Sequence, residues 1–162
     1  MRALIYAVLL AAAALLQAAW LVRMDLAGAI LDPLLPIAVA VGILRGAVPG
    51  AAVGLCGGLL QDLLSGGPLG VQGLTKLVVG FASGLFERSI YIENPLLPAV
   101  AAFVGTLLSE ALLAAVGQVT GLGRESVGAV GRALAQAALN SAIAPLLFRG
   151  IRRLEIHLER PR

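Results

Sequence analysis

The chain has 162 residues, of which 59% are hydrophobic and only 13% are charged, and its net charge is +3. Soluble domains carry roughly 25% charged residues, so this composition is typical of an integral membrane protein and excludes a disordered or fibrous chain. The length corresponds to one domain. Because Cys56 is the only cysteine, an internal disulfide is excluded, and no zinc, haem or redox spacing is present.

Apolar segments along the chain predict six membrane-spanning helices joined by polar loops. The first segment is apolar apart from Gln17 and ends at Trp20 and Arg23, residue types typical of the membrane interface. A cleaved signal peptide is the alternative for this segment, although the apolar run exceeds the usual signal-peptide core. The expected spans are residues 3–22, 34–44, 47–64, 71–86, 96–118 and 133–148.

The loops and the tail complete this organisation. Asn94 followed by Pro95 predicts the start of the fifth helix, and residues 119–132 are expected to form the longest loop. Residues 1–148 then form the transmembrane domain. Residues 149–162 form a basic amphipathic tail, which we expect to continue the last helix and to lie on the membrane surface.

Six spans place both termini on one side of the membrane. The Lys and Arg residues favour an arrangement with both termini in the cytoplasm, since eight then fall in inner segments and four in outer ones. The inner residues are Arg2, Arg45, Arg88, Arg149, Arg152, Arg153, Arg160 and Arg162, and the outer ones are Arg23, Lys76, Arg124 and Arg132. Five of the eight inner basic residues belong to the tail. Because they do not form a basic face, a nucleic-acid partner is not expected.

Glycine recurs at every fourth position through the second and third predicted spans. This glycine series comprises Gly42, Gly46, Gly50, Gly54 and Gly58, and the fourth span adds Gly80 and Gly84. Glycine inside a helix costs about 1 kcal/mol relative to alanine, but in lipid small residues at this spacing let two helices approach closely. We therefore predict that Gly50, Gly54, Gly58, Gly80 and Gly84 serve partner binding or helix packing. The preferred hypothesis is a docking surface for a partner's single helix or for a second copy of the chain.

Polar residues gather toward the outer ends of the predicted spans. An ionisable group facing lipid is costly, so Asp62, Lys76 and Glu110 should face the interior of the bundle. With Ser65 and with Asn140, near the middle of the sixth span, they predict an outward-facing polar pocket. Because Asp62 and Lys76 flank one loop at similar depth, an ion pair between them is expected.

Simpler interpretations of these residues remain open at this point. Asp62 could end its helix at the interface, and the Lys76 side chain could extend to water. His157, the only histidine, lies in the tail and is expected to be a solvated surface residue. A Ser65–Lys76 dyad lacks a group to orient it. The sequence thus predicts no enzyme activity, no cofactor and no metal.

The segment 54-GLCGGLLQDLLSGGPLGVQGL-74 resembles the MreD family of bacterial rod-shape-determining membrane proteins. That family has a glycine-rich third helix ending in Asp, then a short Ser-Gly loop and Leu-Gly. The matching residues are Gly54, Gly58, Leu60, Asp62, Leu63, Ser65, Gly66, Leu69, Gly70 and Leu74. The chain length, the six spans, an Asp-Pro loop before the second span and a basic tail agree more loosely.

The resemblance implies a non-enzymatic scaffold in the bacterial inner membrane that helps organise peptidoglycan synthesis and cell shape. It implies MreC as a partner, and links to RodA, to its penicillin-binding transpeptidase and indirectly to MreB filaments. The implied fold is similar to the S components of energy-coupling-factor transporters. The family's acidic residue corresponds to Asp62 and its loop to Ser65–Gly70, whereas nothing is carried over to Lys76 or Glu110.

The alternative function is a solute-binding membrane component of an S-component-type transporter. The predicted outer pocket favours this alternative. The low aromatic content, 4% of residues, disfavours it for flat ring-containing ligands, which would have few side chains on which to stack. The scaffold is therefore the preferred prediction.

Overall fold

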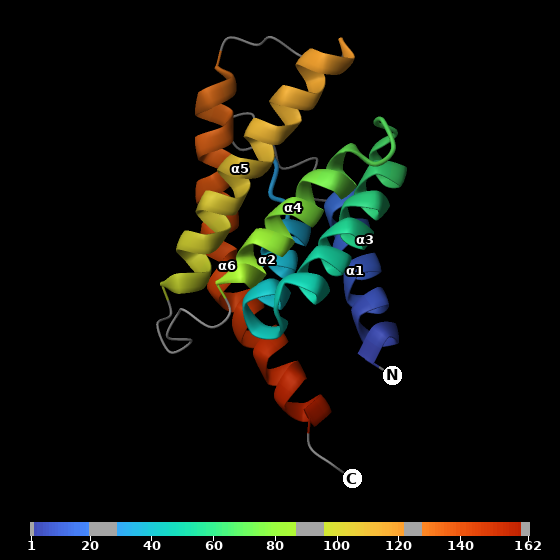
Figure 1. The fold of residues 1–162 in the computed structure, drawn as a ribbon, viewed down its shortest axis with the longest axis vertical. Coiled ribbons are helices and arrows are strands. Elements are labelled where there is room, and N and C mark those ends of the chain that lie inside the picture. The colour runs from blue at the N-terminus through green and yellow to red at the C-terminus, as the bar shows by residue number, and fades with distance from the viewer. Residues whose placement is uncertain (1, 20–28, 87–95, 122–127, 160–162) are drawn as a thin grey trace.

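A computed structural model describes residues 2–19, 29–86, 96–121 and 128–159. The regular elements in these ranges are six helices, in agreement with the predicted fold class (Figure 1). Their bounds are α1 Arg2–Ala19, α2 Leu34–Arg45, α3 Ala47–Ser65, α4 Val71–Leu85, α5 Leu97–Thr120 and α6 Ala129–Glu159.

The helices differ in whether they could cross a membrane. By length and hydropathy α1, α3, α5 and α6 are candidate spans, whereas α2 and α4 are shorter apolar helices of 12 and 15 residues. At about 1.5 Å per residue, α2 and α4 are shorter than the ~30 Å hydrocarbon layer. Where six spans were predicted the described residues thus form six helices, and four of these have the length and hydropathy of a span.

Helix α2 forms the centre of the molecule. Every residue from Leu34 to Ile43 is buried, and α2 packs against α3, α4, α5 and α6. This explains why the segment is hydrophobic on all sides, since a helix with that pattern must be surrounded. The longer helices instead bury a narrow stripe. In α1 the buried residues Tyr6, Leu10, Ala14 and Gln17 follow helical spacing, Leu9 and Ala13 are half-buried beside them, and Leu4, Val8, Leu15 and Leu16 are exposed.

A single residue, Gly46, connects α2 to α3. Its φ of 92° lies in the left-handed region, which only glycine enters without strain. The chain therefore reverses sharply between Arg45 and Ala47, in the gap between the predicted spans 34–44 and 47–64.

One of two predictions about the last helices needs revision. Helix α5 continues to Thr120 and α6 begins at Ala129, so the loop between them is shorter than the predicted 119–132. Helix α6 then runs without a break to Glu159, which confirms that the tail continues the sixth helix. Trp20, Arg23, Asn94 and Pro95 lie outside the described residues.

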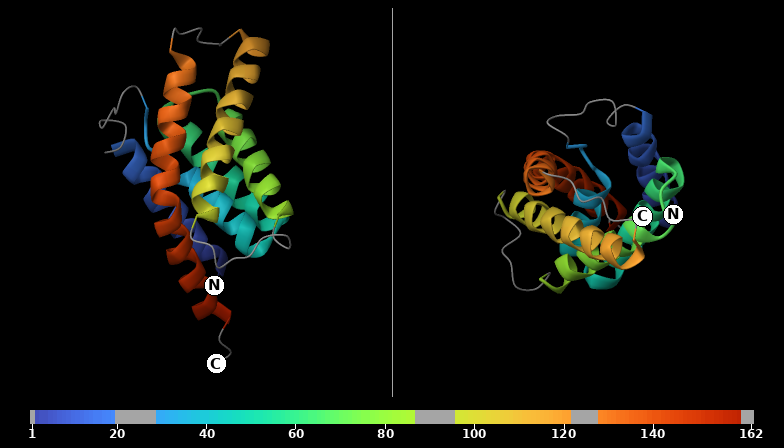
Figure 2. Two further views of the ribbon diagram at one scale, coloured as in Figure 1. Left: turned by 90° about the vertical axis from the view of Figure 1, so that its left-hand side faces the viewer. Right: turned by 90° about the horizontal axis from the view of Figure 1, so that it is seen from above.

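The two ends of the described chain lie at the same end of the bundle (Figures 1 and 2). The guanidinium of Arg2 donates a hydrogen bond to the carbonyl oxygen of Leu158 at 3.2 Å. At this end the Tyr6 hydroxyl also donates to the carboxylate of Glu155, and Arg45 Nε lies 3.8 Å from Glu155 Oε2. These contacts join α1, α2 and α6 and bury Glu155, together with Ile151, against the bundle.

Candidate functional site

Three members of the glycine series, Gly50, Gly54 and Gly58, lie inside the molecule between α3 and α4. A Cβ atom built at Gly54 would lie 2.2 Å from the carbonyl oxygen of Lys76, and one at Gly58 would lie 2.3 Å from that of Gln72. A Cβ at Gly50 would lie 2.4 Å from the carbonyl oxygen of Gly80. Each contact falls far below van der Waals distance, so only glycine permits this approach of the two backbones.

The spacing of these contacts defines an antiparallel pairing. Successive contacts advance four residues along α3 and retreat four along α4, as the pairs formed by Gly50, Gly54 and Gly58 show. Gly84 extends the same surface, since a Cβ there would lie 2.3 Å from the backbone nitrogen of Ala47. Because these glycines meet a helix of their own chain, they are not exposed surfaces for a partner, and the docking interpretation of the glycine series is replaced by internal helix packing.

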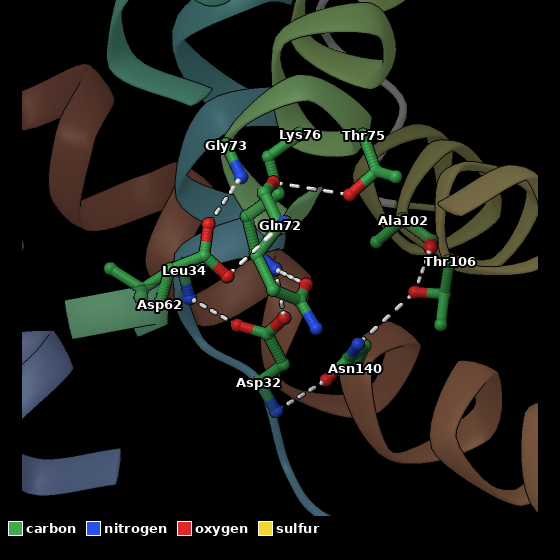
Figure 3. A network of polar contacts seen from close by, with 10 residues as sticks. All are labelled: Asp32, Leu34, Asp62, Gln72, Gly73, Thr75, Lys76, Ala102, Thr106 and Asn140. Atoms are coloured by element: carbon green, nitrogen blue, oxygen red, sulfur yellow. Dashed lines mark hydrogen bonds and ion pairs between the residues drawn. The ribbon is translucent and has the colours of Figure 1, made fainter. Parts of the chain in front are cut away.

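Asp62 caps the N-terminus of α4. Its carboxylate oxygens accept the backbone N–H of Gly70 at 2.8 Å. They also accept those of Gln72 at 3.2 Å and Gly73 at 3.3 Å, which are drawn in Figure 3. The first N–H groups of a helix have no intrahelical partner, and Gly70, the N-cap residue, has no side chain to supply one. A carboxylate at this position also interacts favourably with the helix dipole.

The predicted Asp62–Lys76 ion pair does not form, because Asp62 is already bonded to the start of α4. The Ser65 hydroxyl lies next to it and donates to the carbonyl oxygen of Asp62 at 3.4 Å. Gly66 follows at the C-cap of α3 with a φ of 67°. The Asp–Ser–Gly pattern thus builds the turn of a helical hairpin.

Lys76 pairs with Asp32, a residue that the sequence interpretation placed only in a loop. The Lys76 Nζ atom lies 2.8 Å from Asp32 Oδ2 and donates to Gln72 Oε1, also at 2.8 Å. Lys76 is 0% exposed, so its side chain does not extend to water. A buried ammonium is tolerated only when it is paired and hydrogen-bonded, and both partners are present here.

Asp32 connects this ion pair to the remaining helices. Its Oδ1 atom accepts the backbone N–H of Leu34 at 3.1 Å, which positions the carboxylate at the start of α2. Its own backbone N–H donates to Asn140 Oδ1 on α6 at 3.0 Å. Asn140 Nδ2 in turn donates to the Thr106 hydroxyl on α5 at 3.1 Å, and that hydroxyl donates to the carbonyl oxygen of Ala102.

We call the residues Asp32, Gln72, Lys76, Thr106 and Asn140 the interior polar network (Figure 3). It joins α4, α5, α6 and the residues preceding α2. Two predicted site residues, Lys76 and Asn140, belong to it. Glu110 is half-buried on α5, where the charges of Lys76 and Asp32 act on it. Asp62 and Ser65 form a separate group at the α3–α4 turn.

The sequence interpretation missed Asp32 and Thr106. A signal for Asp32 was present, because an Asp before Pro33 and an apolar run is typical of a helix start. The only lysine of the chain also lies in an apolar helix and therefore needs a carboxylate. Spacing along the chain could not select Asp32 over Asp62, since the two are 30 residues apart and approach Lys76 from different helices.

The hydrogen bonds and the ion pair of the interior polar network connect helices of the chain to one another. The ammonium of Lys76, the carboxylate of Asp32 and the amide of Asn140 are bonded to other groups of the chain. Among the described residues, no group of three or more His, Cys, Asp or Glu side chains could hold a metal ion.

Comparison with known proteins adds the family to this geometry. No curated protein and no solved structure matches the chain. A family model described as rod shape-determining protein MreD matches residues 1–154, which include all six helices up to the last turns of α6 and every member of the interior polar network. The chain therefore belongs to the MreD family of rod-shape-determining membrane proteins.

Proposed function

We propose that the chain is a non-enzymatic scaffold of the bacterial elongation complex in the inner membrane, with MreC as its direct partner. The family match over residues 1–154 carries this proposal. In the same proposal, both termini lie in the cytoplasm, the contacts to RodA and its penicillin-binding transpeptidase are made within the membrane, and MreB is reached indirectly. A second copy of the chain remains a further candidate partner.

The distribution of side chains supports a scaffold. The members of the interior polar network are bonded to one another, whereas large apolar side chains on α1, α4 and α5 point outward. Examples are Val8 on α1, Phe81 on α4 and Val104 on α5. In lipid there is little hydrophobic drive for helix association, so a partner helix must pack closely against such a face or add hydrogen bonds. The outer faces, rather than the glycine series, are therefore the candidate contact surfaces for MreC.

Co-purification from membranes tests this proposal. The tagged chain is co-expressed with MreC, extracted in mild detergent and compared with an unrelated multi-pass protein carrying the same tag. We expect MreC to be retained by the chain and not by the control. Absence of MreC from a folded, monodisperse preparation of the chain would contradict the proposal.

The solute-binding alternative predicts a different effect of substitutions in the interior polar network. If the interior polar network bound a solute, neutralising Asp32 and Lys76 together would abolish a ligand-induced rise in melting temperature. The scaffold proposal instead expects no metabolite to raise the melting temperature of the wild-type chain. It also expects Asp32→Asn/Lys76→Met to retain MreC. The mutual bonding of Asp32, Lys76 and Asn140 favours the scaffold.

A further inference from the structure

The end of α6 carries three arginines on one exposed face. Arg149, Arg152 and Arg153 are all exposed and are spaced i, i+3 and i+4. At about 100° per residue they fall within an arc of roughly 100°. A different face carries Phe148, Ile151 and Glu155, which are buried. The arginine face therefore points away from the bundle.

The length of α6 places this face near a membrane boundary. Its 31 residues extend about 46 Å, against a hydrocarbon layer of ~30 Å. Its last turns project beyond the other helices, at the end where the termini lie (Figures 1 and 2). Leu146, one turn before the arginines, is 73% exposed, as expected for a side chain that faces lipid.

Contacts with the bundle fix the orientation of this end. Glu155 accepts the Tyr6 hydroxyl and lies beside Arg45, and Leu158 accepts a hydrogen bond from Arg2. Helix α6 is thereby held by side chains of α1 and α2 on its buried face. Rotation of its last turns would break these contacts, so the arginine face is held outward.

The three arginines lack anionic partners within the described part of the chain. No ion pair is recorded there for Arg149, Arg152 or Arg153, and the one described carboxylate nearby, Glu155, lies on the buried face. Like charges three and four residues apart on a helix repel each other. An external anion would relieve this repulsion, and guanidinium groups bind phosphate through paired N–H donors.

We propose that Arg149, Arg152 and Arg153 form a binding site for the headgroup of an anionic phospholipid. Ile156 favours a lipid over an acidic protein segment, because it is 48% exposed and lies within the same arc as the arginines. Its apolar side chain suits the boundary between headgroups and acyl chains. The site is separate from the contacts proposed for MreC, so either proposal can fail without the other.

Lipid binding to the purified chain tests this site. The chain in neutral detergent is titrated with phosphatidylglycerol or phosphatidylcholine, and bound lipid is counted by native mass spectrometry. With ~1 kcal/mol per arginine near an anionic surface, we expect phosphatidylglycerol to bind at least about tenfold more tightly. R149Q/R152Q/R153Q should lose this preference, and raised salt should weaken it.

Three further measurements separate the alternatives. R149K/R152K/R153K keeps the charge and should retain most of the preference, and R23Q/R124Q/R132Q removes the same charge elsewhere and should retain it fully. If the triple glutamine variant does not fold, the single variants R149Q and R153Q should each show partial loss. Equal binding of both lipids by the wild-type chain overturns the proposal, whether or not an acidic peptide binds. Displacement of the lipid by equimolar inorganic phosphate would also overturn it.

Discussion

Lys76 shows how a single residue organises this protein. Its ammonium is bonded to Asp32 and Gln72, and its carbonyl oxygen lies against Gly54 of α3. The Lys76 side chain therefore points toward the residues that precede α2, whereas its backbone packs against α3. A buried ion pair is costly to form, and here it joins parts of the chain that are distant in sequence.

Removing one member of this ion pair should be strongly destabilising. Lys76→Met leaves a buried carboxylate without its cation, which costs about 3–5 kcal/mol. Asp32→Asn removes the charge but keeps the oxygen that accepts the Leu34 N–H. The double variant should lose less stability than the two single losses combined, by on the order of 2 kcal/mol. Denaturation in detergent followed by circular dichroism measures this difference, and strict additivity would show that the pair is not coupled.

Asp62 should contribute to stability as a helix cap. Asp62→Ala leaves three backbone N–H groups of α4 without their acceptor and should cost about 2 kcal/mol. Asp62→Asn keeps one acceptor oxygen and should cost roughly half as much. Hydrogen exchange at Gly70, Gln72 and Gly73 should rise more in Asp62→Ala than in Asp62→Asn. Unchanged exchange at these amides would contradict the capping role.

At the scale of elements, the glycine series determines the closeness of α3 and α4. The same surface fixes Gln72 and Lys76 of α4 against α3, so the interior polar network depends on it. The series therefore serves the fold rather than a partner, which the sequence could not decide. Small residues at four-residue spacing identify a close contact in lipid but do not show whether the second helix belongs to the same chain.

A methyl group at Gly54 should separate these two helices. Gly54→Ala would place its Cβ 2.2 Å from the Lys76 carbonyl oxygen, and overpacking of this kind costs about 1–3 kcal/mol. Gly131→Ala on α6 is the matched control, since a Cβ there meets nothing within 4 Å and should stabilise its helix by up to ~1 kcal/mol. Melting temperatures in detergent measure both effects. Equal effects of the two substitutions would rule out the close contact at Gly54.

Most of the fold could be predicted from the sequence because the apolar segments are long and their boundaries carry Gly, Pro and polar residues. The bounds of α3 and α4 differ from the predicted spans by at most one residue at each end. The partner of Lys76 could not be predicted, because it depends on which helices pack together. The central position of α2 was not predicted from the sequence either, although its uniform hydrophobicity is consistent with complete burial.

At the scale of the whole molecule, the interior builds the bundle and the exterior is left for partners. The long helices expose apolar side chains such as Leu15 on α1 and Leu108 on α5, whereas Lys76 and Asp62 are almost fully buried. In the scaffold role that we propose, neighbours would bind through the outer helix faces. We therefore expect MreC to contact residues that are exposed in the isolated chain.

A photo-crosslinking scan in membranes tests this claim most directly. A photoreactive amino acid replaces Val8, Leu15, Phe81, Val104 or Leu108, one at a time, in cells that contain MreC. We predict that crosslinks to MreC concentrate on neighbouring positions of one outer face, and that the pattern persists in the Asp32→Asn/Lys76→Met background. Contact of MreC with the outer helix faces would be contradicted if no outer position crosslinked to MreC, or if the folded double variant lost every crosslink.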